Sequence, residues 1–257
     1  MGMPEYLVFR LYGPLASWGG IAVGEHRPAE PSPTKSAILG LVGAALGVRR
    51  DDAVAQTRLR SDYMIATIVH RGSTLLRDFH TTQVAPERAK KNYWRFATRK
   101  EELSIPRDEL KTILSAREYL CDALYTVCLK TTTADPIYSL VEIAEGLRHP
   151  HFVPYLGRKS CPMALPFQPQ VVAGSNLREA LEAVTFHDQD LLRSRPGGKP
   201  EERTTGMLYW EGDEETGFTT EARYTKPRRD LPIDRTKWQF VERDEHSARI
   251  EIPAGVQ

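Results

Sequence analysis

Residues 86–100 combine positive charge with aromatic rings. Glu87 is the one acidic residue of this segment, whereas six residues are basic: Arg88, Lys90, Lys91, Arg95, Arg99 and Lys100. Three aromatic residues lie among them: Tyr93, Trp94 and Phe96. Cations neutralise phosphates, and aromatic faces stack on unpaired bases at about 1–3 kcal/mol per base. The pattern predicts a site for single-stranded RNA; the alternative is a solvated loop whose rings pack on the parent domain or on a neighbouring protein.

A second group of candidate residues surrounds the start of a predicted helix. Thr34, Lys35 and Ser36 place two hydroxyls and a cation where free N–H groups and the helix dipole favour an anion such as phosphate. Arg27 lies just upstream and adds a second cation to this surface. The segment is not a P-loop, because no glycine precedes the lysine. An ordinary N-cap explains Thr34 equally well.

A third group forms a compact glycine loop: Tyr155, Gly157, Arg158, Lys159 and Ser160. A glycine lets an RNA backbone approach closely, and the two cations supply charge for phosphates. The alternative is a tight turn with solvated cations. We therefore predict that this loop contacts RNA.

Two single residues add to the candidate RNA site. Trp18, beside Gly19, either stacks on a base or fills the core next to a turn. His80 either contacts RNA or serves as an acid or base in its cleavage. The pair His149 and His151 lacks further ligands at a recognisable spacing, so we expect neither a metal site nor a cofactor.

The composition sets limits on the partner and the compartment. The chain has 257 residues, with 35 basic and 34 acidic side chains and a net charge of +1, so any RNA site must come from local clustering. Its three cysteines are odd in number and lack zinc-type spacing, which favours a reducing cytoplasm. The sequence has neither a signal-peptide pattern nor about 20 consecutive apolar residues, so we expect a cytoplasmic protein without a membrane partner.

The elements that must position these residues follow a recognisable order. Strands are predicted at residues 6–12, 63–69, 120–130 and 164–172. Helices are predicted after caps at Thr34, at Asp51 or Asp52, and at Asp135. The pattern loses core periodicity between the second and third strands, over an insertion at about residues 77–117. This order predicts an α+β fold, a ferredoxin-like (RRM-like) βαββαβ domain over residues 1–175, with one sheet face free for a ligand.

The final third carries weaker signals. Asn176 is a good cap for a helix through Val184, and hairpin-like segments follow at residues 207–210 and 218–224. We predict that residues 176–257 form this helix and a small β-rich C-terminal appendage.

Four segments together resemble the CasD family of type I-E CRISPR Cascade subunits, which belongs to the repeat-associated RNA-binding superfamily. They are YLVFRLYGPLASWG, RPAEPSPTKSAILGLVGAALGVRRDD, REYLCDALYTVCL and PYLGRKSCPMALP, in that order over roughly the first two thirds of the chain. The resemblance implies a non-catalytic subunit that binds the 5′ handle of the CRISPR RNA and caps the backbone filament. It also implies that the insertion is a β-hairpin thumb, that the partners are the CasC backbone subunit and the CasA large subunit, and that target DNA is met only through the complex.

Two other functions stay open. Relatives from type I-C systems process precursor CRISPR RNA themselves without a metal, and they are expected to carry a tyrosine where this sequence has Leu46. That departure argues against an endoribonuclease. The third function is a protein-only scaffold whose basic insertion binds an acidic partner.

Overall fold

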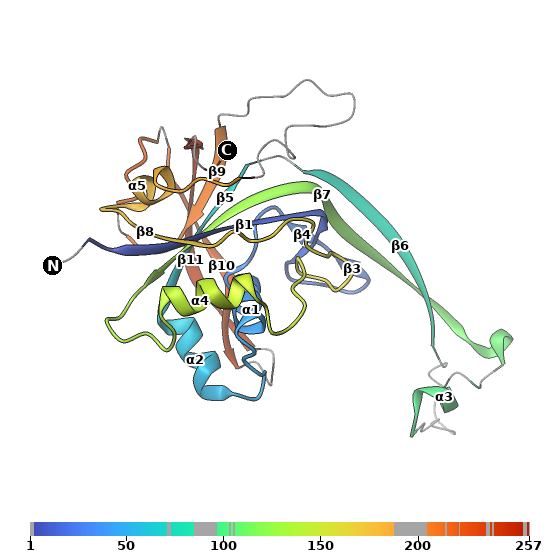
Figure 1. The fold of residues 1–257 in the computed structure, drawn as a ribbon. Helices are drawn as coiled ribbons and strands as arrows, with labels where there is room; N and C mark the ends of the chain where they lie inside the picture. The colour runs from blue at the N-terminus through green and yellow to red at the C-terminus, as the bar shows by residue number, and fades with distance from the viewer. Residues whose placement is uncertain are drawn as a thin grey trace.

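The fold is built on a large, predominantly antiparallel sheet with few helices (Figure 1). The computed structural model describes residues 3–70, 73–84, 97–102, 104, 106–187, 205–213, 215–220, 222–234, 237, 239–253 and 256. Over these residues the main sheet has nine strands, and a separate two-stranded ribbon pairs β2 (Trp18–Gly19) with β4 (Ala29–Glu30).

Four strands form the centre of the sheet, in the order β5-β7-β1-β8. They are β1 (Glu5–Ala16), β5 (Tyr63–Val69), β7 (Lys111–Thr131) and β8 (Gln170–Ala173), and each neighbouring pair is antiparallel. The predicted strands at 6–12, 63–69 and 120–130 all lie within these elements. The fourth is shorter than predicted, and Gln168, just before it, has a positive φ of 48°.

The sheet is covered on both faces. Leu7, Phe9 and Leu11 of β1 pack with α1 (Lys35–Ala45) and α4 (Leu140–Arg148). Tyr6 and Val8 point to the opposite face, in a cluster with α5 (Leu177–Glu182) and strand β9 (Thr205–Trp210). Contrary to our expectation, the second face is not free, because α5 packs against it together with side chains that β9 and the later strands of the same sheet direct to this face.

Local capping signals explain where the helices begin. Thr34 caps α1, since its Oγ1 accepts a hydrogen bond from the Ala37 N–H at 3.1 Å. Asp52 caps α2 (Ala53–Ser61) in the same way. The predicted cap at Asp135 is wrong: α4 begins four residues later, where Ser139 and Glu142 satisfy each other's backbone N–H groups in a capping box.

The C-terminal third continues the main sheet beyond β5. The order is β10-β11-β9-β5, with β10 (Tyr224–Asp234) and β11 (Gln239–Glu251) forming a long hairpin beside β9. Asn176 caps α5 as predicted. Residues 176–257 thus contribute strands to the shared sheet, where we had expected a small appendage, because β9 pairs with β5 at four positions from Ala66 to Val69.

A two-stranded arm extends far from this body (Figure 1). It pairs β6 (Thr74–Val84) with the first half of β7, and α3 (Arg99–Glu102) and the short 3-10 helix η1 (Arg107–Glu109) lie towards its far end. We call this hairpin the thumb. β7 runs on into the centre of the sheet, so one strand joins the thumb to the core.

Candidate nucleic-acid interface

Three separate segments meet where the thumb leaves the body. β3 (His26–Arg27) pairs in parallel with β7, which sets Arg27 opposite Arg117. The Arg158 Nη2 donates a hydrogen bond to the Arg27 carbonyl at 3.2 Å, although 131 residues separate them. The fold therefore brings the predicted residues Arg27 and Arg158 together, with Arg117 as a third cation that the sequence interpretation missed. We call Arg27, Arg117 and Arg158 the thumb-base cluster.

The guanidinium of Arg158 is held in place by the thumb strand. It donates to the Glu118 carbonyl at 3.3 Å and lies 4.9 Å over the ring of Tyr119. The Arg27 side chain is exposed and donates to the Gly24 carbonyl at 2.6 Å. An oriented guanidinium plane beside an exposed cation suits recognition of phosphate or of an unstacked base.

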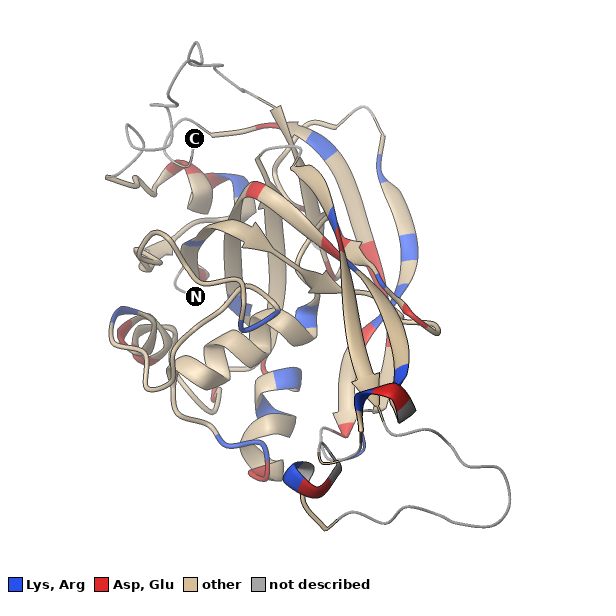
Figure 2. Ribbon diagram, turned by 90° about the vertical axis from the view of Figure 1, so that its right-hand side faces the viewer, with Lys and Arg blue, Asp and Glu red and all other residues tan. Residues whose placement is uncertain are grey.

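Glu118 fixes the thumb strand to its neighbours. Its carboxylate accepts hydrogen bonds from Arg77 Nη2 at 2.8 Å and from the Ala29 N–H at 3.3 Å. These bonds, the one from Arg77 first, lower the pKa of Glu118 below its usual value. Figure 2, which faces the thumb side of the molecule, shows acidic residues interspersed with basic ones along the strands. The thumb-base cluster is thus a local concentration of charge rather than part of a uniformly basic face.

The glycine loop has a structural requirement that differs from the predicted one. Gly157 has a φ of +88°, and a Cβ there would lie 2.0 Å from the Ser17 carbonyl oxygen. The glycine therefore lets the loop pack on the end of β1, where the Leu156 carbonyl accepts from the Ser17 N–H at 3.0 Å. Tyr155, Lys159 and Ser160 are exposed around it, so these side chains remain in our proposed interface.

Trp18 lies in the core. It is 1% exposed, and its ring meets that of Tyr125 edge to face at a centroid distance of 5.5 Å. The indole face is therefore not available to stack on a base, and the alternative of a core residue is what the structure has. We leave Trp18 out of the proposed interface.

Lys35 is also withdrawn from solvent. It is 6% exposed, and its Nζ contacts Glu211 Oε1 at 2.7 Å and the Tyr63 carbonyl at 3.0 Å. Its backbone N–H donates to Asp230 Oδ2 at 2.7 Å, so a carboxylate from β10 occupies the anion position at the helix start. Lys35 therefore holds the C-terminal strands to α1, and we remove it from the proposed interface. Thr34 serves as the N-cap, and the half-buried Ser36 lies beside it with 3.0 Å between the hydroxyl oxygens.

The same helix start carries a buried charge network. Arg228 Nη1 contacts Glu245 Oε1 at 2.6 Å, and Arg243 Nε contacts Asp230 Oδ1 at 2.7 Å. Arg228 also donates to Ser32 Oγ at 2.9 Å, which ties β10 to the segment preceding α1. Buried charges are stable only when they are paired and hydrogen-bonded, as here. This network links the final third of the chain to the first.

The described part of the thumb exposes three apolar side chains that we did not predict. Leu75, Phe79 and Leu114 lie on one face by the strand register, and they are 50%, 65% and 48% exposed. His80 lies on the other face, with its Nδ1 2.7 Å from Asp78 Oδ2. The other predicted thumb residues lie outside the described residues: Arg88, Lys90, Lys91, Tyr93, Trp94 and Arg95.

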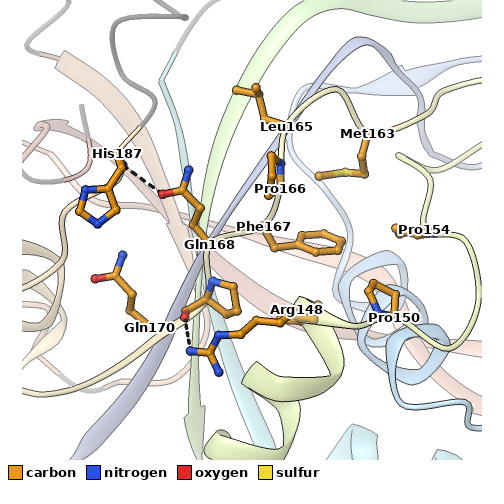
Figure 3. A pocket seen from close by; sticks show the side chains of 12 residues that line it. Arg148, Pro150, Pro154, Met163, Leu165, Pro166, Phe167, Gln168, Gln170 and His187 are labelled. Atoms are coloured by element: carbon orange, nitrogen blue, oxygen red, sulfur yellow. Dashed lines mark hydrogen bonds between the residues drawn. The ribbon is translucent and has the colours of Figure 1, made fainter.

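An apolar cavity of about 650 Å³ lies beside α4 (Figure 3). Leu147, Pro150, Met163 and Phe167 contribute to its walls. Arg148 is the arginine of the lining, and its Nη2 already donates to the Pro169 carbonyl at 3.0 Å. Because the walls offer little charge to a phosphate, we do not assign this cavity to RNA.

The described residues contain neither a cluster of metal ligands nor a membrane-spanning helix. Nowhere in the described ranges do three His, Cys, Asp or Glu side chains cluster as metal ligands would, and His149 Nε2 instead lies 3.4 Å from Glu145 Oε1. Cys121, Cys128 and Cys161 are free thiols. None of the helices that the structure describes is long and apolar enough to cross a bilayer.

Comparisons with known proteins give a consistent family. Residues 6–245 match the family described as CRISPR-associated protein (Cas_Cas5). The CRISPR system Cascade subunit CasD of Escherichia coli (strain K12) is 35% identical over 191 residues, which cover 70% of this chain and 76% of that protein. A chain of a CRISPR RNA-guided surveillance complex has 26% identity and a TM-score of 0.62, covering 98% of this chain and 92% of that one. A crystal structure of a Cas protein has 26% identity and a TM-score of 0.60, covering 96% and 95%.

Proposed function

From the premise that this chain belongs to the Cas5 family and is homologous to the CasD subunit of Cascade, we propose how it works. It is a non-catalytic subunit of a type I-E CRISPR surveillance complex, where it binds the 5′ handle of the CRISPR RNA and caps the backbone filament. This role supports antiviral defence in the cytoplasm, a reducing compartment that suits three free cysteines.

The thumb-base cluster carries this proposal. Arg27, Arg117 and Arg158 come from three segments and converge beside the arm, where Arg158 is fixed by two carbonyls and a tyrosine ring. A chain of phosphates can contact these cations in succession, and guanidinium planes can stack on unpaired bases. Tyr155, Lys159 and Ser160 extend the same surface.

The central strands support a ferredoxin-like assignment for residues 1–175. Their order β5-β7-β1-β8, with α1 between β1 and β5 and α4 between β7 and β8, is the order expected of a βαββαβ unit. In this assignment the thumb, at about residues 77–117, is an insertion between the second and third strands of the unit.

The thumb also supports a role in assembly. Its exposed apolar side chains, Leu75, Phe79 and Leu114, share one face with the Arg77–Glu118 ion pair, and this mixed surface suits a protein neighbour better than it suits phosphates. We assign this face to the CasC backbone subunit. The CasA large subunit lies beside the handle, and target DNA is reached through the assembled complex.

The rival activity, metal-independent cleavage of precursor RNA, has less support. Leu46 occupies the position expected for a tyrosine in type I-C relatives, and it packs partly buried against the core at the end of α1. The nearest partner of His80 is Asp78, at 2.7 Å, on the same strand. General acid–base cleavage needs two groups within reach of the 2′-hydroxyl and the leaving oxygen.

Co-expression with the neighbouring genes and a CRISPR array tests the proposal. Purification through a tag on this chain, followed by sequencing of the bound RNA, should return guide RNA with a defined repeat-derived 5′ end. Replacing Arg27 and Arg158 by glutamine should lower RNA recovery several-fold, because both phosphate contacts are lost. The matched control is Arg178→Gln on α5, a half-exposed arginine outside the cluster.

Two results would contradict this function. Purified chain that cuts precursor RNA at the repeat in EDTA would identify it as the processing enzyme. A complex that assembles with its protein partners but contains no RNA would identify it as a protein-only scaffold.

A further inference from the structure

A second cavity, also of about 650 Å³, lies at the opposite end of α1 from Leu46. It is open to solvent and is lined by three groups of residues: Gly19, Gly20, Ile21 and Glu30 on the side of the ribbon; Thr34 and Ser36 at the start of α1; and Lys226, Pro227, Arg228, Arg229, Asp230 and Phe240 of the C-terminal hairpin. Its volume is in the range that binds a small organic group or a nucleotide. Thr34 and Ser36 were predicted to bind RNA, whereas the hairpin residues were not.

The lining offers two cations that are not part of the buried network. Lys226 is 51% exposed, and its Nζ is 3.8 Å from Glu245 Oε2, a loose contact that leaves most of the ammonium in water. Arg229 is exposed and donates from Nε to the Phe240 carbonyl at 3.1 Å. Arg229 lies at an irregularity in the β10–β11 register, between Arg228 and Leu231, and such bulges redirect side chains.

The remaining lining groups suit the other parts of a nucleotide. The Thr34 and Ser36 hydroxyls can bond to phosphate oxygens, and the half-buried ring of Phe240 offers an aromatic surface for a base. Two carboxylates line the cavity: Asp230 is paired with Arg243 at 2.7 Å, and Glu30 can accept a hydrogen bond from a ribose 2′-hydroxyl. The cavity therefore matches a ribonucleotide better than a purely anionic or purely apolar ligand.

The ribbon joins this cavity to the thumb base. Glu118, next to Arg117 in the sequence, accepts a hydrogen bond from the Ala29 N–H, and the adjacent residue Glu30 lines the cavity. Gly19 pairs with Ala29 across the ribbon. A single-stranded RNA that contacts the thumb-base cluster can therefore continue over the ribbon without crossing the body of the protein.

We propose that this cavity binds one nucleotide of the guide RNA, with Lys226 and Arg229 contacting its flanking phosphates, so that the C-terminal hairpin is part of the RNA-binding surface. This inference rests on the proposed function, and it extends the RNA site from the first two thirds of the chain to the last.

The test measures RNA binding by the full-length chain. A labelled single-stranded RNA with the repeat-derived 5′ sequence is titrated at several salt concentrations against Lys226→Gln, Arg229→Gln and the double variant. Each lost phosphate contact should lower the slope of log affinity against log salt by about 0.7, and the double variant should bind several-fold more weakly. Arg229→Lys keeps the charge without the Nε–H bond and should retain most of the affinity. Arg249→Gln, an exposed arginine of β11 outside the cavity, is the matched control.

The outcomes separate this inference from the function on which it rests. If the double variant keeps its affinity and slope while the Arg27→Gln and Arg158→Gln pair loses both, the handle does not enter the cavity and only this inference fails. If neither pair of substitutions changes binding, or the unaltered chain binds no RNA, the proposed function fails as well. If the double variant binds RNA normally but no longer co-purifies with its protein partners, the cavity is a protein contact and the inference is overturned.

Discussion

Tyr12 donates a hydrogen bond of 2.7 Å to Asp122 Oδ1 at the point where β7 changes from core strand to thumb strand. Asp122 has a φ of 56°, but the register is the same on both sides of it: Gly13 pairs with Ala123, and Leu15 pairs with Cys121. Asp122 is therefore a local left-handed residue in β7 that leaves the strand pairing unchanged, and the bond from Tyr12 holds its side chain against β1.

We expect substitutions at Asp122 to separate backbone strain from the hydrogen bond. Asp122→Ala and Asp122→Gly both lose the bond, but only alanine keeps a Cβ in the left-handed region. The alanine variant should be less stable than the glycine variant by about 1 kcal/mol. Urea unfolding of the two variants measures the difference, with Tyr12→Phe as the variant that loses the bond alone. Equal stabilities would mean that the backbone relaxes at this position.

Lys35 should stabilise the fold and contribute nothing direct to RNA affinity. Lys35→Met leaves Glu211 as an uncompensated carboxylate in a largely buried position, which costs about 3–5 kcal/mol. Adding Glu211→Gln keeps the acceptor for the Ile65 N–H and removes the charge, so it should restore much of the loss. Denaturant unfolding measures the stability, and the RNA affinity of the folded double variant should equal that of the parent. A double variant that is stable but binds RNA weakly would return Lys35 to the interface.

The contrast between Thr34 and Lys35 shows what the sequence can and cannot predict. The caps at Thr34, Asp52 and Asn176 were predictable because each cap bonds to a residue three positions away. The carboxylate partners of Lys35 lie 176 and 195 residues along the chain, so no local pattern distinguishes a structural lysine from a phosphate-binding one. The predicted cap at Asp135 was wrong for a different reason, because Ser139 offers a complete capping box four residues later.

The same distinction applies to the candidate site. Arg27 and Arg158 were chosen from separate local motifs, and their proximity depends on the pairing of β3 with β7. Arg117 has no local signal, because it sits in an ordinary strand pattern. The apolar spacing of Leu75 and Phe79 was visible in the sequence, but only the register with β7 shows that Leu114 joins them on one face.

Gly157→Ala should displace the glycine loop. The added Cβ lies 2.0 Å from the Ser17 carbonyl oxygen and the φ is +88°, so the loop has to move as a unit and take Arg158 with it. We expect a loss of at least about 1 kcal/mol in stability together with weaker RNA retention. Gly43→Ala in α1 is the matched control, because its Cβ would make only an ordinary contact, at 3.5 Å from Leu59 Cδ1. Thermal unfolding and RNA recovery check the two effects; a parent-like Gly157→Ala variant would show that the loop does not hold Arg158 in place.

The lowered pKa of Glu118 predicts how acid affects the thumb base. The hydrogen bond from Arg77 is its main cause. The unfolded value is about 4.3, so the stabilisation is present above that pH and is lost as the pH falls through the lower folded pKa. Arg77→Gln should therefore raise the pKa of Glu118 and move the loss to higher pH. Carboxyl NMR titration of the two proteins measures the shift, and an unchanged pKa would assign the effect to the Ala29 N–H instead.

The last prediction concerns the far end of the thumb. Replacing residues 85–104 with a short Gly-Ser linker should leave the chain folded, because Val84 pairs with Lys111 and the remaining β6–β7 ladder stays intact. The deleted sequence lacks the apolar periodicity of a core element, so little burial is lost, but its cations and aromatic residues are removed. Cooperative thermal unfolding near the parent temperature should therefore accompany failure to co-purify with CasC and guide RNA.

A variant of parent length separates the effect of charge from the effect of contact area in residues 85–104. Replacing Arg88, Lys90, Lys91 and Arg95 with glutamine keeps the aromatic residues and the chain length, and should weaken RNA retention while sparing part of the protein contact. If the deletion variant folds and still assembles with RNA, residues 85–104 do not bind the guide, and the thumb-base cluster has to account for RNA binding without them. If the deletion variant cannot fold, residues 85–104 belong to the folded core, and their basic and aromatic pattern no longer supports the prediction of an RNA site.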